Sequence, residues 1–469
     1  MTIKRDLDDF VAGRMQSLAG KHLQIQAHFD ELPTWIQRDL DDTVAWIQED
    51  LKRLDSHIQR HLEVPVDKVQ HDLYETSIEI QRDLQDWFAQ WDLDFIQDET
   101  AADSQSDWEE ETWQTHSELG MNPTAPHCDD SMALENFVLH KVLGRGYFGK
   151  VMLAEFKGSG VYFSIKALNK GKVLAHGIQY LMSEKSVLTL AAGSPFLGHL
   201  YFTFQTSDTL FFVMEYLNGG DLFFHKEQIG CFDLISTQFY AAEMICGLQF
   251  LHRNGVIYRD LKPENVMLDR DGHIKIVDFG LSKLNMLGDE RAKTFCGTPH
   301  YIAPEIILGQ QYFSPVDWWS FGVLLFEMLT DLRPFHGANK KEVYVSVCMD
   351  IPKYPNWINQ ESKDIMEKLL EKDPNHRLGT FGNIREHPFF ESIDWAKLER
   401  REMEPPFKPE LTNPKDCRYF DEELLNETPK VSWGDSRNIG PMDQSAFADF
   451  SSMNPRFFSP FYLQSGDYG

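Results

Sequence analysis

The sequence predicts an α+β fold in which an all-α amphipathic repeat region precedes a part that begins with β-strands. Two observations lead to this prediction. Apolar residues recur every 11 positions through the first 97 residues, and β-branched and aromatic runs separated by glycines follow from residue 137. With 469 residues, of which 42% are apolar and 13% aromatic, the chain is long enough for two or three domains with cores of their own.

The N-terminal repeat is an apolar residue followed by glutamine. The pairs begin at Ile25, Ile36, Ile47, Ile58, Val69 and Ile80. A second apolar residue comes four positions after each, and positions four apart share one face of an α-helix. Pro33 and Pro65 would each cost about 3 kcal/mol inside a helix, so we expect helices over about 3–31, 34–63 and 66–97.

The pattern leaves open what covers the apolar stripe of residues 1–97. An antiparallel three-helix bundle would bury it within the chain, and self-association would bury it between chains, with right-handed supercoiling favoured by the 11-residue period. A helical spacer would have no specific partner. A membrane surface fits less well, because interfacial helices usually carry Lys and Arg on the polar face and these carry acids.

Negative charge is concentrated in the N-terminal third. The net charge of the chain is −28, and residues 1–130 hold 30 Asp and Glu against 10 Lys and Arg. Such a segment is repelled by nucleic-acid phosphates and by anionic lipids, so we expect neither as a partner. Residues 98–133 are acidic and aperiodic, which predicts a linker.

The cysteines and the N-terminus indicate the compartment. The six cysteines stand at least 15 residues apart and form no C-x-x-C pair, which predicts reduced thiols rather than a zinc or redox site. No run approaches 18 apolar residues, and "MTIKRDLDDF" has acids where a signal peptide has an apolar stretch. We therefore expect a cytoplasmic or nuclear chain.

The stretch "KVLGRGYFGKV" at 141–151 predicts a phosphate-binding loop between two strands. Glycines let backbone N–H groups approach phosphate oxygens closely, and Lys166 in the following strand "VYFSIKAL" can reach the same phosphates. A dinucleotide site would open a helix directly after the last glycine, whereas here a strand follows. Glu184, in a helical run, is the candidate carboxylate that orients Lys166.

Three further motifs follow in order: "YRDLKPEN" at 258–265, "DFG" at 278–280 and "APE" at 303–305. An Asp-Gly hairpin, "VMLDRDGHIKIV", separates the first two. Asp260 is suited to accept the proton of an attacking hydroxyl, and Lys262 to neutralise a moving phosphoryl group. Asn265 and Asp278 offer the oxygen ligands that Mg²⁺ requires.

This ordered set is similar to the signature motifs of protein kinases. The runs "TFCGTPHYIAPE", "SPVDWWSFG" and "EPPFKPEL", with the tail that follows, resemble the protein kinase C family and its novel, delta-type members. The resemblance implies a two-lobed protein kinase fold over 134–392, with a β-rich small lobe to about residue 217 and a helical large lobe. It also implies a C-terminal tail over 393–469 that wraps back onto the small lobe.

The resemblance implies ATP and Mg²⁺ as cofactors, Asp260 and Lys262 as catalytic residues, and Asn265 and Asp278 as metal ligands. The nucleotide-binding residues that it implies are Leu143, Gly144, Arg145, Gly146, Tyr147, Phe148, Gly149, Lys150, Val151, Lys166, Glu184, Glu215, Leu217 and Asp221. Met214 would flank the adenine.

The resemblance also implies phosphorylation sites at Thr294, Ser432 and Ser451, and hence an upstream kinase. A phosphate on Thr294 would be bound by Arg259. Asp221, Glu264 and Glu327 match acidic positions that face arginines of the substrate, so we expect protein substrates with basic residues near Ser or Thr. Asp317 is expected to brace the catalytic loop and Arg377 to pair with Glu305.

Four positions depart from the family pattern: Ser164, Tyr147, His300 and Ser452. Ser164 would weaken nucleotide binding and Ser452 would weaken anchoring of the tail.

The family's diacylglycerol-binding modules need clustered Cys and His ligands, and residues 1–133 contain only Cys128, so we expect independence of diacylglycerol. The sequence thus predicts a serine/threonine protein kinase, the alternative being a pseudokinase-like scaffold that acts through its helical repeats.

Overall fold

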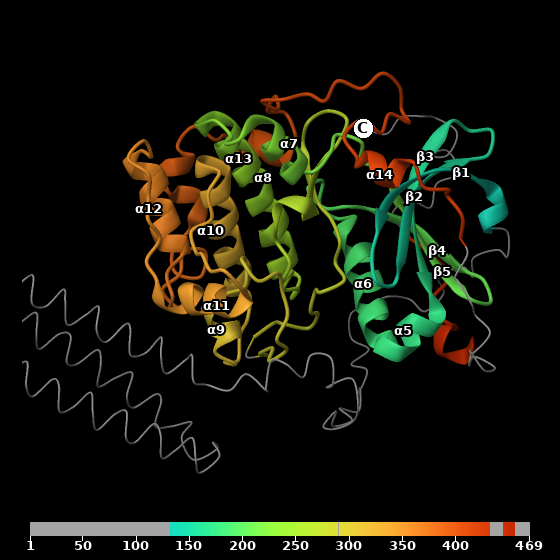
Figure 1. Cartoon of the computed structure of the whole chain (residues 1–469), viewed down its shortest axis with the longest axis horizontal. Coiled ribbons are helices and arrows are strands. Elements are labelled where there is room, and N and C mark those ends of the chain that lie inside the picture. Colours follow the sequence, from blue (N-terminus) through green and yellow to red (C-terminus); the bar gives the residue numbers. More distant parts are fainter. Residues whose placement is uncertain (1–131, 289, 432–443, 455–469) are drawn as a thin grey trace, which may run out of the picture. The chain divides into compact units, whose positions relative to one another are not determined.

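A computed structural model of the chain describes residues 132–288, 290–431 and 444–454 (Figure 1). The predicted helical repeats, the predicted linker up to residue 131 and the predicted phosphosite Ser432 lie outside the described residues. The described part consists of a sheet-containing lobe and a helical lobe, which confirms the predicted α+β, two-lobed fold.

The small lobe is built on a six-stranded sheet in the order β1-β2-β3-β5-β4-β8. Its strands are β1 (Phe137–Arg145), β2 (Gly149–Phe156), β3 (Val161–Asn169), β4 (Leu200–Gln205), β5 (Thr209–Glu215) and β8 (Ser452–Met453). Aromatic side chains of Phe137, Phe163, Phe202, Phe204 and Phe211 form much of one buried cluster against the sheet. The predicted strand, glycine turn, strand order is therefore present.

Two helices separate β3 from β4. They are α5 (Lys170–His176), which is capped by the Asn169 side chain accepting from the backbone N–H of Lys172 at 3.0 Å, and α6 (Ile178–Ala191). Helix α6 buries Leu181, Glu184, Val187 and Leu188, so one turn of an otherwise apolar face carries a carboxylate. This placement brings Glu184 beside Lys166 of β3.

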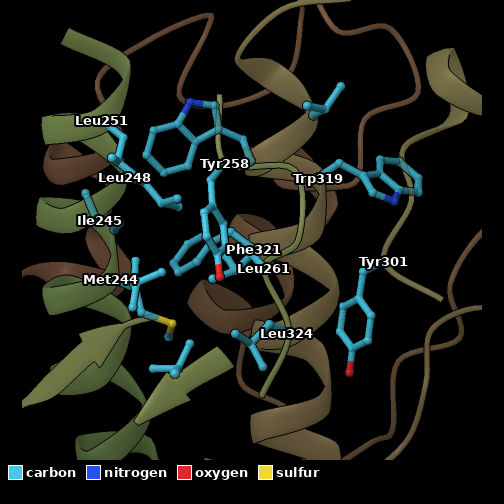
Figure 2. Packing of buried hydrophobic residues seen from close by; sticks show 14 of the residues in the cluster. Met244, Ile245, Leu248, Leu251, Tyr258, Leu261, Tyr301, Trp319, Phe321 and Leu324 are labelled. Carbon is cyan, nitrogen blue, oxygen red and sulfur yellow. The ribbon is translucent and has the colours of Figure 1, made fainter. Parts of the chain in front are cut away.

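The large lobe is organised around α8 (Leu234–Arg253) and α10 (Pro315–Thr330). Every residue of α10 is buried, which explains why the run "PVDWWSFGVLLFEMLT" is apolar on all sides. Figure 2 shows Met244, Leu248 and Leu251 of α8 near Tyr258 and Leu261 of the chain that follows α8, with residues of α10 close by. The core of the large lobe thus holds the segment that carries the catalytic motif.

The other elements of the large lobe are short. They are α7 (Leu222–Ile229), η4 (Pro263–Asn265), β6 (Val266–Leu268), β7 (Ile274–Ile276), α9 (Pro304–Ile307), α11 (Lys340–Met349), α12 (Gln360–Leu369), η5 (Ile384–Glu386), η6 (Pro388–Phe390) and α13 (Trp395–Glu399). Strands β6 and β7 form the hairpin that the Asp-Gly pair predicts, with Gly272 at φ +95°. Each helix within the described ranges is too short or too polar to cross a lipid bilayer.

The C-terminal tail returns to the small lobe, as predicted. It contributes α14 (Glu422–Leu425), η8 (Gln444–Phe447) and β8, which pairs antiparallel with β4. The Phe450 ring lies 5.2 Å from the ring of Phe212 and is fully buried. Ser452 lies opposite Thr203 in the β8–β4 pair, and the two hydroxyl oxygens are 3.3 Å apart. The serine expected to weaken this contact therefore has a polar partner.

Candidate active site between the two lobes

The glycine loop connects β1 and β2 by a tight turn in which the Gly146 N–H donates to the Gly149 carbonyl at 2.9 Å. A Cβ atom at Gly149 would lie 1.8 Å from the Ala167 carbonyl oxygen, so close packing on β3 requires this glycine. The other two glycines are different. A Cβ at Gly144 would meet Val151 no closer than 3.8 Å, and one at Gly146 would meet nothing within 4 Å. The protein leaves this space free, which fits a phosphate group approaching the backbone.

Lys166 lies on β3 opposite Val151 of β2, on the same face as Ser164. Its Nζ is 2.5 Å from Glu184 Oε1 of α6 and 3.3 Å from Asp278 Oδ1 of the large lobe. Although burial alone would lower the pKa of Lys166, attraction to Asp278 and Glu184 raises it above its usual value. Lys166 likewise lowers the pKa of Asp278. The lysine therefore stays charged and joins the two lobes.

The motif "YRDLKPEN" forms a compact polar network. The Asn265 amide Nδ2 donates to the carboxylate of Asp260 at 2.9 Å and to its backbone carbonyl at 2.8 Å. Lys262 Nζ is 2.9 Å from Asp260 Oδ2. The Thr298 hydroxyl donates to Asp260 Oδ1 at 2.7 Å and accepts from Lys262 Nζ at 3.1 Å. The carboxylate of Asp260 is therefore fixed in orientation on both oxygens.

Asp317, at the start of α10, binds the backbone of this motif segment. Its two carboxylate oxygens accept the backbone N–H groups of Tyr258 at 2.9 Å and Arg259 at 2.7 Å, and a His252 ring nitrogen lies at 2.7 Å. Asp317 is fully buried, so these hydrogen bonds satisfy a charge that water does not reach. The predicted brace is confirmed.

Two motif residues have left-handed backbones, Arg259 at φ +69° and Asp278 at φ +55°. Such conformations are uncommon outside glycine and persist only where the surroundings enforce them. For Arg259 the Asp317 contact does so, together with its own side chain, which donates to the Leu281 carbonyl at 2.6 Å. The sequence motifs contain no signal for this strain.

The "DFG" segment lies directly beside the catalytic loop. The Val277 N–H donates to the Asn265 carbonyl at 2.9 Å, and the Tyr258 hydroxyl donates to the Val277 carbonyl at 2.5 Å. These bonds bring the two predicted metal ligands, Asn265 and Asp278, to neighbouring positions. In the described part of the chain no three His, Cys, Asp or Glu residues gather into a metal site. Two oxygen ligands suit Mg²⁺, which is usually completed by water and substrate phosphates.

The connection between the lobes runs from Met214 to Asp221. The carboxylate of Glu215 accepts the His199 N–H at 2.7 Å and lies 3.1 Å from Lys275 Nζ, so its side chain is occupied within the fold. Leu217 is buried. Asp221 caps α7 by accepting the Phe224 N–H at 2.8 Å, a role that the sequence motifs did not indicate.

The tail crosses this connection. The Tyr216 hydroxyl donates to the Asp416 carbonyl at 2.8 Å, and the Tyr216 ring stacks on Phe420 with ring centres 6.2 Å apart. Farther along, the tail residue Glu427 pairs with Arg145 at 2.7 Å and Lys150 at 3.4 Å. The side chains of these two predicted nucleotide-binding residues thus contact the tail.

The three acids expected to face the substrate differ in their exposure and partners. Glu327 is buried and accepts the Tyr301 hydroxyl at 2.7 Å, and burial raises its pKa. Arg333 Nε lies 3.4 Å from the other oxygen of Glu327. Burial also raises the pKa of Asp221 to about 6, with a contribution from the charge of Glu264. Glu264 itself is exposed, and its charge acts on both of the other acids.

Two of the predicted phosphosites, Thr294 and Ser451, lie within the described residues, and both are exposed. Arg259 Nη1 donates to the Tyr312 hydroxyl at 2.9 Å, and that hydroxyl donates to the Thr294 carbonyl at 2.7 Å. Arg259 is therefore already connected to the Thr294 segment through Tyr312. The Ser451 hydroxyl accepts from Gln205 of β4 at 3.3 Å.

Sequence reasoning missed Thr298, Tyr312 and Glu427. Thr298 lies inside the run "TFCGTPHYIAPE", where the pattern gave no reason to choose among its polar residues. Tyr312 and Glu427 act on the site only through contacts between segments distant in the sequence.

Among the departures from the pattern, His300 has a pKa lowered by burial, and Tyr147 is exposed with its ring 5.0 Å from Lys172 Nζ.

Comparison with known proteins decides the family. Residues 137–390 match the family described as protein kinase domain. The chain belongs to the protein kinase family. A second family, described as protein kinase C terminal domain, matches residues 411–451 of the chain, in the tail.

Curated relatives agree with both matches. The chain is 59% identical to human protein kinase C delta type over 325 residues, which is 69% of this chain and 48% of that protein. It is 47% identical over 328 residues to a putative protein kinase C delta type homolog of Drosophila melanogaster, covering 69% of this chain and 49% of that one. Protein kinase C-like 1 of Caenorhabditis elegans is 47% identical over 332 residues, which cover 69% of this chain and 47% of that one. The resemblance to the protein kinase C family is confirmed, and the chain spans about half the length of the curated relatives it matches.

Proposed function

We propose that this protein is a serine/threonine protein kinase that transfers the γ-phosphoryl group of Mg-ATP to protein hydroxyls. The observation that carries the proposal is the convergence of Lys166 of the small lobe with Asp278 of the large lobe, at 3.3 Å. Members of the protein kinase family use ATP and Mg²⁺. The free space beside Gly144 and Gly146 and the oxygen pair of Asn265 and Asp278 fit such a nucleotide.

Each residue has a distinct part in the proposed reaction. Lys166, oriented by Glu184, would bind the α- and β-phosphates, and Asn265 and Asp278 would hold Mg²⁺, which would supply neutralisation of the phosphate charge. Asp260 accepts the proton of the substrate hydroxyl, while Lys262 stabilises negative charge on the group in transfer. Thr298 keeps the Asp260 carboxylate aligned, because it donates to Oδ1 at 2.7 Å.

A phosphoryl-transfer assay with a basic peptide tests the proposal. The wild-type chain is expected to label the peptide in a Mg²⁺-dependent manner, and Asp260→Asn is expected to lose nearly all turnover while remaining folded. Equal labelling by both proteins would instead favour the scaffold alternative, in which the fold serves only to bind partners.

We further propose that substrates carry Arg or Lys near the acceptor Ser or Thr. Asp221, Glu264 and Glu327 support this, because the exposed carboxylate of Glu264 lies close enough to the other two acids for its charge to raise the pKa of each. Comparing an Arg-containing peptide with its Arg→Ala analogue tests the preference. Glu264→Gln is expected to raise KM for the Arg peptide and to leave KM for the analogue unchanged.

We propose that phosphorylation of Thr294 by an upstream kinase strengthens the contact with Arg259, with Ser432 and Ser451 as further sites.

Activity is proposed to be independent of diacylglycerol, since residues 1–133 offer one cysteine as a zinc ligand. Stimulation of the purified chain by diacylglycerol in lipid vesicles would contradict this.

For residues 1–97 we propose self-association through the apolar stripe, in a chain that resides in the cytoplasm or nucleus. Sedimentation of the full chain tests the first part. A species at twice the chain mass or more is expected, and a monomer at all concentrations would exclude self-association.

A further inference from the structure

The tail segment 425–430 lies against the base of the glycine loop. Lys141 Nζ of β1 donates to the Leu425 carbonyl at 3.1 Å, and Glu427 binds Arg145 at 2.7 Å and Lys150 at 3.4 Å. Arg145 and Lys150 are the two residues that flank the glycine loop in the β1–β2 register. The carboxylate of Glu427 therefore holds both ends of the loop that approaches the phosphates.

Thr428 follows Glu427 directly and is exposed, whereas Glu427 and Pro429 on either side are partly buried. The backbone there is fixed by a hydrogen bond from the Lys430 N–H to the Thr428 carbonyl at 2.8 Å. Thr428 thus presents a hydroxyl to solvent from a segment whose neighbours are anchored. The next residue, Pro429, has a fixed φ and no N–H group.

We propose that Thr428 is a phosphorylation site for a proline-directed protein kinase, and that its phosphate strengthens the hold of the tail on the glycine loop. In this reaction the Thr428 Oγ1 forms a bond to the γ-phosphorus of ATP bound to the partner kinase. The bond from that phosphorus to the β–γ bridging oxygen breaks, ADP leaves, and the hydroxyl proton passes to the partner kinase's base.

The charges around Thr428 argue for a partner kinase rather than for self-phosphorylation. Asp421, Glu422, Glu423 and Glu427 precede it within seven residues, and the first three are exposed. An active site that selects basic substrates disfavours such a segment. This step of the argument rests on the substrate preference proposed above.

A phosphate at Thr428 has an effect that the unmodified hydroxyl lacks. It carries about −1.5 to −2 charges and accepts charge-assisted hydrogen bonds, which Arg binds in a bidentate fashion. Neighbouring Cα atoms are about 3.8 Å apart, so this charge enters beside the Glu427 carboxylate. Arg145 binds the adjacent residue Glu427, and its side chain is 56% exposed, which leaves it accessible to a second anion. Lys430 adds a further positive charge two residues on. The phosphate shares these cations with Glu427 and increases the attraction between tail and loop.

The experiment uses the full chain carrying Asp278→Asn, so that no result depends on its own activity. It is incubated with Mg-ATP and a purified proline-directed kinase, and phosphorylated residues are located by mass spectrometry. Stoichiometric phosphate on Thr428 is expected, with a rate at least about tenfold lower in the matched Pro429→Ala chain, a difference of about 1.4 kcal/mol. Absence of phosphate on Thr428, or an unchanged rate with Pro429→Ala, would overturn the assignment of the site.

Amide hydrogen exchange over residues 143–151 then tests the consequence. Phosphorylation is expected to slow exchange in this loop at least about twofold, which reports reduced local opening. The double variant Arg145→Ala and Lys150→Ala is expected to lose the slowing, with thermal unfolding used to verify that it is folded. Slowing that persists in this variant, or no slowing in the parent chain, would refute the tail-to-loop mechanism. A failure of the proposed kinase activity would leave both results unchanged.

Discussion

Two ion pairs of similar chemistry lie in different parts of this molecule. Arg377 and Glu305 in the large lobe form a two-pronged pair at 2.7 and 2.9 Å, with side chains 0% and 2% exposed. Lys166, Glu184 and Asp278 meet between the lobes, and the Asp278 side chain is 54% exposed. The first pair is closed to water and confirms the expected partnership of Arg377 with Glu305. The second is open to solvent at Asp278.

The difference teaches that solvent exposure of one partner, rather than pairing itself, distinguishes the contact proposed to be functional from the structural pair. Arg377 is held by further bonds to the carbonyls of Glu371 and Pro315, both at 2.9 Å, so its position depends on the protein alone. Asp278 is bound to the protein mainly by the amine that is proposed to bind nucleotide. Loss of the buried pair should therefore affect folding, and loss of the open contact should affect turnover.

The largest expected effect comes from breaking the buried pair. Glu305→Ala leaves the Arg377 charge buried without a carboxylate, which should lower the free energy of unfolding by about 3–5 kcal/mol. Urea denaturation measures this. The double variant Glu305→Met and Arg377→Met should recover part of the loss, and a single variant as stable as wild type would refute the structural role.

Asp278→Asn should instead lower turnover strongly and change the free energy of unfolding little. Because the Lys166–Asp278 contact is solvent-exposed, the free energy of unfolding should change by less than about 1 kcal/mol. Turnover should fall at least about 100-fold, as when one preorganised electrostatic group is removed. Peptide phosphorylation and urea denaturation of the same sample measure the two quantities. A large loss of stability with normal turnover would reverse the comparison.

Thr298→Ala should have a smaller effect on turnover than Asp278→Asn. It removes a hydrogen bond to the Asp260 carboxylate, so kcat should fall about tenfold, or about 1.4 kcal/mol, while KM for ATP changes little. Thr298→Ser keeps the hydroxyl and serves as the matched control. Equal kcat values for the alanine and serine variants would show that the hydroxyl does not align Asp260.

The smallest effect concerns the pH dependence at Asp221. Burial raises its pKa from 3.8 in the unfolded chain to about 6. Because folding raises the pKa of Asp221, its carboxyl group binds the proton more tightly in the folded state. Protonated Asp221 therefore contributes fully to stability below pH 3.8, and this contribution is lost as pH rises through about 6. Asp221→Asn keeps the helix cap but cannot titrate. The free energy of unfolding of wild type relative to this variant should fall as pH rises across that range, and a difference that stays the same at all pH values would contradict the shift.

The sequence predicted those parts of the site that depend on residue type and local order. The glycine loop, the strand of Lys166, the Asp-Gly hairpin and the pairing of Arg377 with Glu305 were expected and are present. Glycine positions and strand alternation are local signals, and they indicated the first three features. The pairing of Arg377 with Glu305 was implied by the resemblance to the protein kinase C family.

The remaining features arise from contacts between distant segments. Nothing local marks Thr298 as the partner of Asp260, nor Glu427 as the partner of Arg145, 282 residues away. The left-handed backbone of Arg259 likewise results from tertiary hydrogen bonds that override local preference. Gly149 is required by the Ala167 carbonyl, whereas Gly144 and Gly146 leave free space, and the motif alone does not distinguish these reasons.

The central claim is that Lys166, Asn265 and Asp278, drawn from both lobes, bind one Mg-nucleotide. Calorimetric titration with ATP, in the presence of Mg²⁺ and of a chelator, tests it most directly on wild type and Asp278→Asn. We expect wild type to bind ATP more tightly with Mg²⁺ and Asp278→Asn to lose this difference. Equal affinity of wild type with and without Mg²⁺, or an undiminished Mg²⁺ effect in Asp278→Asn, would contradict the account.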